Sequence, residues 1–270
     1  MHYIRFPKST SGGLAFSADG TLMALAQRSE GSDSLQIHAC EDSWVVVRSF
    51  EIETEDVADV SWAPHAHVLC VLDAPTKHQV LLYTAEGECL RRFAPLDEAR
   101  GIRQLSWSPD GRLLALGAFG GHVTLLGGLS HLSWERIARL EHPEAMKASF
   151  APDAVGFVEQ EQGAARGYAA HKLPLASLSD RLVAEGGSAD AAASGVRISA
   201  WSAGGRYLAT CCERLPSMLW LWDGDTLGLH SVVLQQQPIS NVSWNPSRQV
   251  HRKEPEKPAP PFLPSPLNPS

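Results

Sequence analysis

The sequence lacks the features of several common protein classes, and each absence narrows the possible function. Basic residues are not in excess: 23 Lys and Arg stand against 30 Asp and Glu, a net charge of −7, whereas proteins that follow nucleic-acid phosphates usually carry a strong basic excess. The five cysteines, an odd number, include no Cys-x-x-Cys pair. We therefore expect no nucleic-acid partner, and we expect buried, reduced thiols in a cytosolic protein rather than a disulfide framework.

Long apolar runs are missing as well. The first nine residues, MHYIRFPKS, have no apolar segment behind their charges, so the sequence predicts no signal peptide. The most membrane-like stretch, 113–129, contains five glycines and His122 and alternates like two strands around a Gly-Gly turn. We expect a soluble protein of the cytoplasm that has no membrane partner.

No catalytic constellation is present either. The sequence has no Gly-x-Ser-x-Gly, no glycine loop that would cradle a phosphate, and no Cys/His pair at the spacing of a nucleophile and its base. The closest histidines, His65, His67 and His78, fall at a turn and a strand edge, where surface histidines are more common than metal ligands. The sequence thus predicts a protein that is not an enzyme and that uses no cofactor and no metal.

The sequence does contain one motif in six near-copies, which we call the phrase. The clearest copy is QLSWSPDGRLLALG, residues 104–117. Subtracting the successive aromatic positions of the copies (16, 62, 107, 150, 201, 244) gives intervals of 46, 45, 43, 51 and 43 residues. A period of about 45 residues with a hairpin turn in each unit is typical of a β-propeller blade, and such a scaffold by default binds other proteins.

The third copy shows why each unit should form a blade. Leu105 and Trp107 alternate with polar residues, which is the period-two pattern of a half-buried strand. The turn Ser108–Gly111 follows, and its aspartate recurs in other copies as Asp19 and Asp153, so we interpret these residues as turn formers rather than catalytic carboxylates. Further strands expected at 112–117, 122–126 and 134–140 complete a four-stranded unit.

The fifth copy ends its third strand with Trp222-Asp223, the dipeptide that is typical of WD repeats. We therefore predict an all-β fold, a WD-repeat β-propeller of about five four-stranded blades plus an incomplete one, arranged as an open arc. The aromatic residues of the five blades, Phe16, Trp62, Trp107, Phe150 and Trp201, should occupy equivalent buried positions. Apolar blade faces should be exposed at both ends of the arc.

The predicted organisation has three parts. Residues 1–8 form the outer strand of a preceding blade that is absent, residues 9–246 form the propeller array, and the proline-rich residues 247–270 are disordered because proline cannot donate to a sheet. Blades should begin near residues 12, 57, 102, 145 and 196, and a sixth should start near 240. The fourth blade is the weakest: strand-like pieces at 156–159 and 168–173 precede a segment rich in Ala, Ser and Gly, which we interpret as a mobile loop in place of the outer strand.

The surface that faces a partner should lie on the loops between the second and third strands of each blade and on the loops between blades. By repeat register these loops place Arg28, Lys77, Phe119 and Arg214 together on one face. Phe119 is the best single candidate because the Gly-rich turn around it has no evident packing need for an aromatic ring. The alternative is that Phe119 folds onto the edge of its own blade.

The non-consensus residues of the repeats resemble one particular family. The segments that carry the resemblance are GIRQLSWSPDGRLLALGAFGGHVTLLGG (101–128), DVADVSWAPHAHVLCVLD (56–73) and RYLATCCERLPSMLWLWDGDTLGLHSVVLQQQPISNVSWNP (206–246). They are similar to the WD-repeat protein family of centriolar satellites and spindle poles, and the resemblance covers about residues 3–246. It implies a non-catalytic scaffold at the centrosome that anchors spindle microtubules and supports spindle assembly and cilium formation. The partners it implies are a coiled-coil adaptor of centriolar satellites or spindle poles and a minus-end-directed kinesin.

Two alternatives of another class remain open at this point. A WD-repeat propeller can also be the substrate receptor of a ubiquitin ligase or a translation-initiation β-propeller. A ligase receptor would bind its cullin adaptor, whereas a translation factor would sediment with ribosomal subunits.

Overall fold

The computed structural model describes residues 7–8, 11–65, 67–74, 76–94, 101–127, 134–143, 151–162, 165–173 and 195–245. Within these ranges the chain is all-β: its regular structure consists of strands and one short 3-10 turn, η1 (Ser11–Gly13). None of the described segments is a helix with the length and apolar character needed to cross a membrane. The strand expected around Phe150, most of the expected strand in 1–8 and the proline-rich residues 247–270 lie outside the described residues.

The strands form four antiparallel meanders. The first sheet holds β1 (Leu14–Phe16), β2 (Leu22–Ser29), β3 (Ser32–Ala39) and β4 (Val45–Ile52), and the second holds β5 (Asp59–Trp62), β6 (Val68–Leu72), β7 (Val80–Thr84) and β8 (Cys89–Phe93). The third sheet holds β9 (Ile102–Trp107), β10 (Leu113–Ala118), β11 (His122–Gly127) and β12 (Glu135–Glu141). The last sheet holds β15 (Val196–Trp201), β16 (Tyr207–Cys212), β17 (Met218–Asp223) and β18 (Gly228–Leu234), extended by β13 (Val155–Gln162) and β14 (Ala165–Lys172). Strands follow one another within each meander as the sequence predicts for propeller blades.

The turn between the first two strands of a sheet is built by an aspartate, as expected. In the first sheet the Asp19 carboxylate accepts hydrogen bonds from the Ser17 hydroxyl (2.6 Å) and the Thr21 backbone N–H (3.0 Å). In the third sheet Asp110 accepts the same pair of bonds, from Ser108 (2.6 Å) and Arg112 (3.1 Å). Both aspartates are therefore turn formers, which confirms their interpretation from the sequence.

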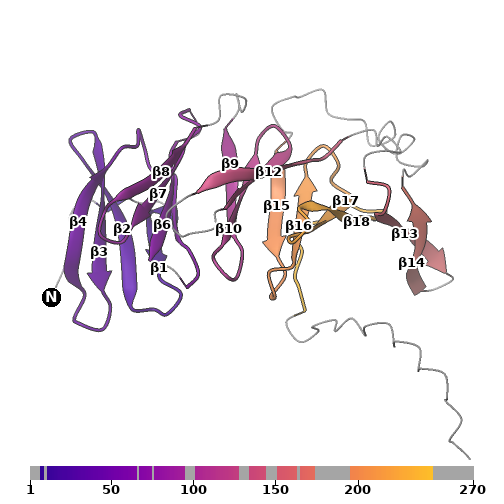
Figure 1. The fold of residues 1–270 in the computed structure, drawn as a ribbon, viewed down its shortest axis with the longest axis horizontal. Helices are drawn as coiled ribbons and strands as arrows, with labels where there is room; N and C mark the ends of the chain where they lie inside the picture. The colour runs from indigo at the N-terminus through magenta and orange to yellow at the C-terminus, as the bar shows by residue number, and fades with distance from the viewer. Residues whose placement is uncertain are drawn as a thin grey trace, which may run out of the picture.

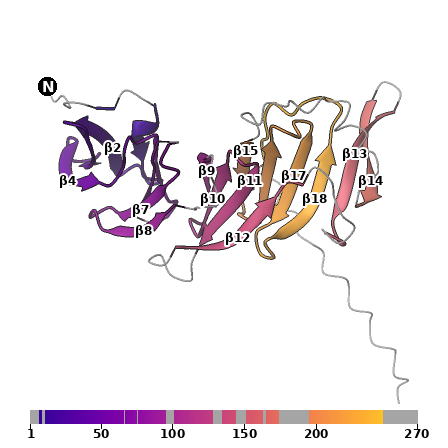
Figure 2. The same ribbon diagram turned by 90° about the horizontal axis from the view of Figure 1, so that it is seen from above.

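The sheets stand side by side in a row whose two ends do not meet (Figures 1 and 2). Each hydrophobic core lies between two successive sheets. Leu35, Val60 and Leu81 belong to the core between the first and second sheets, and Val68, Leu82 and Leu114 to the core between the second and third. Because the side chains of a strand alternate between its two faces, β10 serves two cores: Leu114 faces the second sheet and Ala115 the last sheet.

A tryptophan in the first strand of the second, third and last meanders fixes the distance to the preceding sheet. Trp62 Nε1 donates to the carbonyl of Ala15 (3.1 Å), Trp107 Nε1 to the Ser61 hydroxyl (3.1 Å), and Trp201 Nε1 to the carbonyl of Ser106 (3.1 Å). Trp244 repeats the bond to the carbonyl of Ala200 (3.0 Å), so the sixth copy of the phrase also lies on the preceding sheet. In every case the acceptor residue directly precedes the aromatic residue of the neighbouring sheet.

The bond from Trp201 reaches the third sheet, so the last sheet packs directly on the third and the fourth copy does not stand between them. The described part of the fourth copy is instead the β13–β14 hairpin, which adds to the outer edge of the last sheet through parallel pairing of β13 with β18. This differs from the expectation of a separate fourth blade. The strand-like pieces are confirmed as strands, but their pairing partner is β18 (Figure 2).

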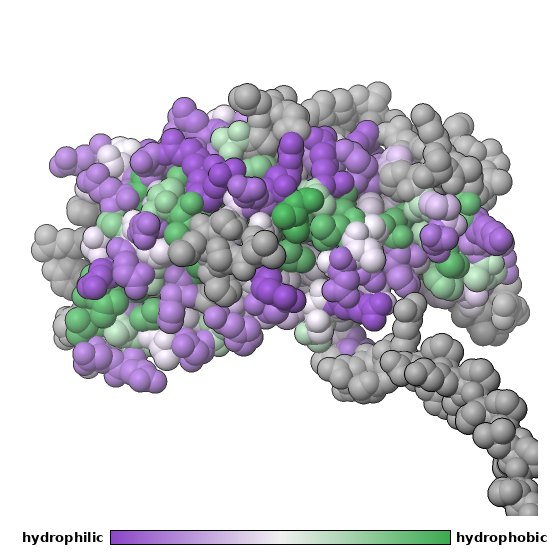
Figure 3. Space-filling view, viewed as in Figure 1, coloured by the Kyte–Doolittle hydropathy of each residue, from purple (hydrophilic) through white to green (hydrophobic). Residues whose placement is uncertain are grey.

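One end of the row exposes an apolar surface, in agreement with the expected open arc. Its members are Leu14 and Phe16 on β1 and Trp44 to Val47 at the start of β4, each between 39% and 50% exposed. Figure 3 shows an apolar area at this end of the row. The expectation that Phe16 is buried like Trp62 and Trp201 is wrong, because no described sheet packs on the far side of β1. Phe16 meets Trp44 there in an edge-on arrangement (centroids 6.2 Å apart). Trp107, expected to be buried as well, is half-buried.

Candidate functional site

The four residues predicted for partner binding all lie at the connection between the second and third strands of their sheets. Arg28 is at the end of β2, Lys77 between β6 and β7, Phe119 between β10 and β11, and Arg214 between β16 and β17. In an antiparallel meander these connections are at the same end of every sheet, together with the connections from one sheet to the next. We call this end the loop face.

The structure brings the four residues together in two pairs. Arg28 and Lys77 meet at Glu55 in the β4–β5 connection: Arg28 Nη1 donates to the Glu55 carbonyl (2.6 Å), and Lys77 Nζ lies 3.9 Å from Glu55 Oε2. Phe119 and Arg214 meet at Gly120, whose carbonyl accepts a hydrogen bond from Arg214 Nη2 (3.2 Å). Each pair thus spans the boundary between two neighbouring sheets.

Two buried carboxylates hold the β4–β5 connection in place. Asp73 accepts the backbone N–H groups of Glu55 (2.9 Å) and Asp56 (3.0 Å), and Asp33 accepts the N–H of Val57 (2.8 Å). Asp56 also pairs with Lys8, whose hydrogen bond holds the pKa of the Asp56 carboxyl below its ordinary value. Loops tied by buried, charge-assisted hydrogen bonds present their side chains in a fixed arrangement.

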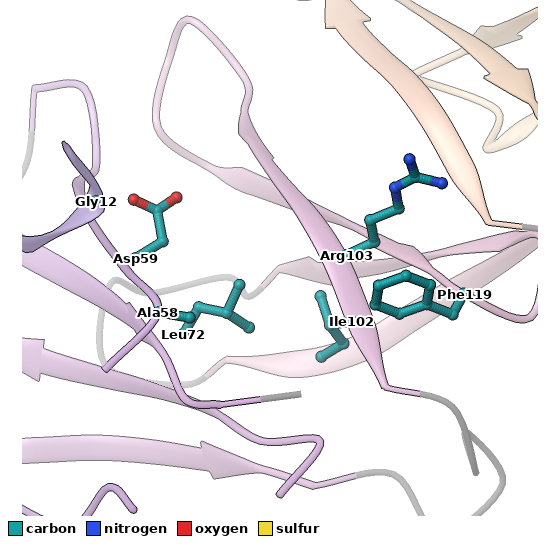
Figure 4. Close-up of a pocket in the computed structure, with 7 residues that line it drawn as sticks. All are labelled: Gly12, Ala58, Asp59, Leu72, Ile102, Arg103 and Phe119. Carbon is teal, nitrogen blue, oxygen red and sulfur yellow. The ribbon is translucent and has the colours of Figure 1, made fainter. Parts of the chain in front are cut away.

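A hollow of about 350 Å³ lies between the two pairs, where the starts of the first three sheets meet. It is lined by Gly12, Ala58, Asp59, Leu72, Ile102, Arg103 and Phe119. Figure 4 shows Asp59 on one side, Arg103 and Phe119 on the other, and the apolar side chains of Leu72 and Ile102 between them. Phe119 is half-buried in the wall of the hollow. This position is intermediate between a ring that faces a partner and a ring that folds onto the edge of its own blade, the two alternatives that the sequence left open.

The hollow exists because one repeat position changes from small to large along the chain. Counting four residues back from the aromatic of the first strand gives Gly12, Ala58, Arg103 and Arg197 in the four sheets. The first two have almost no side chain, and Gly12 cannot have one, since a Cβ there would lie 2.4 Å from the Ala58 carbonyl oxygen. The space that an arginine fills in the later sheets stays open in the first two.

The two charged groups of the hollow have different surroundings. Arg103 is neutralised: its Nη1 lies 2.7 Å from Glu213 Oε2, and its guanidinium stands 5.7 Å from the centre of the Phe119 ring. Asp59 is half-buried and makes no ion pair with any described residue. Its carboxylate accepts the neighbouring N–H of Val60 (3.0 Å). Burial consequently raises the pKa of the Asp59 carboxyl above its ordinary value. Sequence reasoning missed Asp59 and Arg103, although the shared repeat position of Ala58 and Arg103 was a usable signal.

A buried polar chain secures the contact of the last sheet with the third. His142, just after β12, bonds through Nδ1 to the Gly121 carbonyl (2.7 Å) and through Nε2 to the Thr210 hydroxyl (2.7 Å), which accepts the Trp222 indole N–H (2.8 Å). Since the carbonyl can only accept, Nδ1 carries the proton and Nε2 accepts from Thr210. Burial favours this neutral imidazole and lowers the pKa of His142 to about 4.

The structure also places the histidines and cysteines that were considered from the sequence. No three His, Cys, Asp or Glu side chains in these segments are arranged to hold a metal ion. His65 and His67 are exposed at a turn, as expected for surface histidines. All five cysteines are free; Cys70, Cys211 and Cys212 are buried, whereas Cys89 on the outer strand β8 is exposed, contrary to the expectation of buried thiols.

Comparison with known proteins gives matches to WD-repeat proteins and to one translation-factor family. The sequence model of the family described as "Eukaryotic translation initiation factor eIF2A" matches residues 8–159. The chain is 30% identical to the WD repeat-containing protein WRAP73 of Mus musculus over 267 residues, which are 92% of this chain and 56% of that protein. It is 25% identical to an uncharacterized WD repeat-containing protein of Schizosaccharomyces pombe, over 83% of this chain and 44% of that protein. The chain thus spans about half the length of the curated relatives it matches.

Among solved structures, a chain in the crystal structure of the mitotic checkpoint complex has a similar fold. The TM-score is 0.52 at 15% identity, over 86% of this chain and 55% of that chain. At this identity the likeness concerns the fold alone. Together with the stacked four-stranded meanders it confirms the predicted open WD-repeat β-propeller.

Proposed function

This chain is a WD-repeat protein that belongs to the family described as eukaryotic translation initiation factor eIF2A, and from that premise we propose that it is a non-catalytic scaffold that binds other proteins through its loop face. The observation that carries the proposal is the arrangement of Arg28, Lys77, Phe119 and Arg214. These side chains come from equivalent loops of four sheets. Phe119 also lines the hollow that holds Asp59, a carboxylate with no ion-pair partner among the described residues. Aromatic and arginine side chains are the residues that most often anchor protein interfaces.

The finer proposal concerns where this scaffold acts. The segments 56–73, 101–128 and 206–246 resemble the WD-repeat family of centriolar satellites and spindle poles, and the relative WRAP73 is similar over 92% of the chain. We infer a role at the centrosome and spindle pole, in anchoring spindle microtubules and in cilium formation. The partner of this role is a coiled-coil adaptor, together with a minus-end-directed kinesin.

A second candidate function is supported by the family match. Residues 8–159 fit the sequence model named for translation initiation factor eIF2A, and these residues include the first three sheets and the hollow. Under this alternative the loop face binds a component of the translation apparatus, and the chain sediments with ribosomal subunits.

Proximity labelling in dividing cells tests both candidates with one set of variants. The chain carries Phe119→Ala with Arg214→Ala on the loop face, or Arg112→Ala as a matched control in a turn at the opposite end of the third sheet, where its side chain is 74% exposed. We expect wild type and Arg112→Ala to label a coiled-coil centrosomal adaptor and the loop-face variant to lose it. Equal labelling by all three would refute the loop face as the binding surface, and enrichment of ribosomal proteins alone would favour the second candidate.

A further inference from the structure

We propose that the hollow at Asp59 is the specificity pocket of the loop face and that it receives a lysine or arginine side chain of the bound partner. This inference deepens the proposed function, on which it rests, by naming the chemistry of the partner. The partner's cation would pair with the Asp59 carboxylate, and its methylene stem would lie on the apolar floor formed by Leu72 and Ile102.

The charge of the pocket selects a cation. Asp59 has no ion-pair partner among the described residues, and the arginine across the hollow is already neutralised by Glu213 at 2.7 Å. Glu213 therefore prevents Arg103 from repelling an incoming positive charge, and among the described residues no cation compensates the Asp59 carboxylate. A half-buried carboxylate without a partner gains more from an ion pair than an exposed carboxylate does, because water screens it less.

The size and lining of the pocket select one long side chain. A hollow of about 350 Å³ is at the small end of the range for ligand pockets, roughly 300–1,000 Å³, so it accepts a side chain rather than a folded segment. Lysine and arginine place an apolar stem on apolar surface while the charged head meets a polar group. The pocket offers both kinds of contact, because the apolar side chains of Leu72 and Ile102 lie beside the Asp59 carboxylate in its lining (Figure 4).

The repeat itself supplies a precedent for this occupant. At the position of Ala58 the third sheet carries Arg103, whose guanidinium lies beside the carboxylate of Glu213 and over the ring of Phe119. A basic side chain from a partner would complete in the second sheet the arrangement that the chain already has in the third. The small residues Gly12 and Ala58 leave this position open from outside.

The test uses the full chain and two peptides that differ only in charge. Acetyl-Gly-Arg-Gly-amide is titrated into the chain with labelled methyl groups, and the citrulline peptide of the same shape is the neutral probe. We expect the arginine peptide to shift the methyl signals of Ile102 and Leu72 in a saturable manner. Asp59→Asn should weaken this binding roughly 10- to 100-fold, the loss of one charge-assisted hydrogen bond, and the citrulline peptide should bind as weakly to wild type.

Two further variants keep the test decisive. Asp19→Asn removes a carboxylate from a turn at the opposite end of the first sheet and should leave peptide binding unchanged. Ala58→Arg places the arginine of the third sheet in the hollow and should block the peptide even if Asp59→Asn fails to fold, since Ala58 is exposed. Equal binding of both peptides, or binding that survives Ala58→Arg, would overturn the inference.

The outcomes also separate this inference from the proposed function. If Asp59→Asn labels the same cellular partner as wild type while the loop-face variant does not, the scaffold function stands and the cation pocket is refuted. If the arginine peptide binds at Asp59 but no variant changes the proteins labelled in cells, the pocket stands and the loop-face function is refuted.

Discussion

Replacing Thr210 with valine is the sharpest test of the way in which the last sheet is mounted on the third. The Thr210 hydroxyl is the middle of a buried chain: it accepts the Trp222 indole N–H (2.8 Å) and donates to His142 Nε2 (2.7 Å). Valine keeps the branched shape but leaves the Trp222 indole N–H and His142 Nε2 without these hydrogen bonds. Each buried polar group left unpaired costs about 1–3 kcal/mol, so we expect Thr210→Val to lower the free energy of unfolding by about 2–4 kcal/mol.

The measurement is equilibrium unfolding in urea, with Thr226→Val as the matched control. Thr226 is exposed in the β17–β18 turn, and its replacement should change stability by less than about 0.5 kcal/mol. A double-mutant cycle of Thr210→Val with His142→Ala should give a coupling energy of about 1 kcal/mol or more, because the two residues share a bond across 68 positions of sequence. A coupling energy of zero would mean that the third and last sheets are not neighbours, and the direct packing described above would be refuted.

Three further predictions use the same unfolding assay. Gly111→Ala should lower the free energy of unfolding by about 1–3 kcal/mol more than Gly20→Ala does. Both glycines have a positive φ (69° and 73°), but only a Cβ added at Gly111 would meet a neighbour, the Pro64 carbonyl oxygen at 2.1 Å. Equal losses would contradict the close contact of the second and third sheets. The pKa of His142 is about 4 in the folded chain and its ordinary value is 6.5, so the unfolded chain binds the proton first as the pH falls. The free energy of unfolding should therefore fall by about 3 kcal/mol between pH 6.5 and 4. A His142→Ala variant whose free energy of unfolding has the same pH dependence between pH 6.5 and 5 would exclude this residue as the cause. Trp201→Phe should cost about 1–3 kcal/mol through the unpaired Ser106 carbonyl and lost packing, whereas Trp44→Phe, at an exposed position, should change stability little.

The sequence predicts most of the local structure and the spacing of the sheets. The strands of the third copy, its Asp110 turn and the placement of Trp62, Trp107 and Trp201 follow from alternation, turn chemistry and period, all of which are encoded within a few residues. The pairing of β13 with β18 was not predictable in this way. An interval of 51 residues is equally consistent with a weak blade and with an insertion, and the choice depends on contacts between residues about 75 positions apart.

The candidate site was predicted only in part, for a related reason. Repeat register located the loops that carry Arg28, Lys77, Phe119 and Arg214, because a meander returns each such loop to the same end of its sheet. It did not locate the hollow, which depends on the side chains missing at Gly12 and Ala58 and on the sheets that stand beside them. The sequence signal for the hollow is the contrast between the small residues Gly12 and Ala58 and the arginines at the same repeat position in the later copies.

The direct packing of the last sheet on the third, with no fourth blade between them, is connected to the charge of the pocket. Gly195, at the start of the last sheet, packs so closely that a Cβ would lie 3.1 Å from Arg103 Cδ and 3.2 Å from Phe119 Cα. Glu213, the carboxylate that neutralises Arg103, comes from the β16–β17 connection of the same sheet. If a separate fourth sheet stood between them, Arg103 would lose Glu213, its free cation would face Asp59, and the pocket would repel a basic side chain. The direct packing of the last sheet on the third is therefore a condition for the cation site, so a double-mutant cycle that refuted the packing would also remove the electrostatic basis of the pocket.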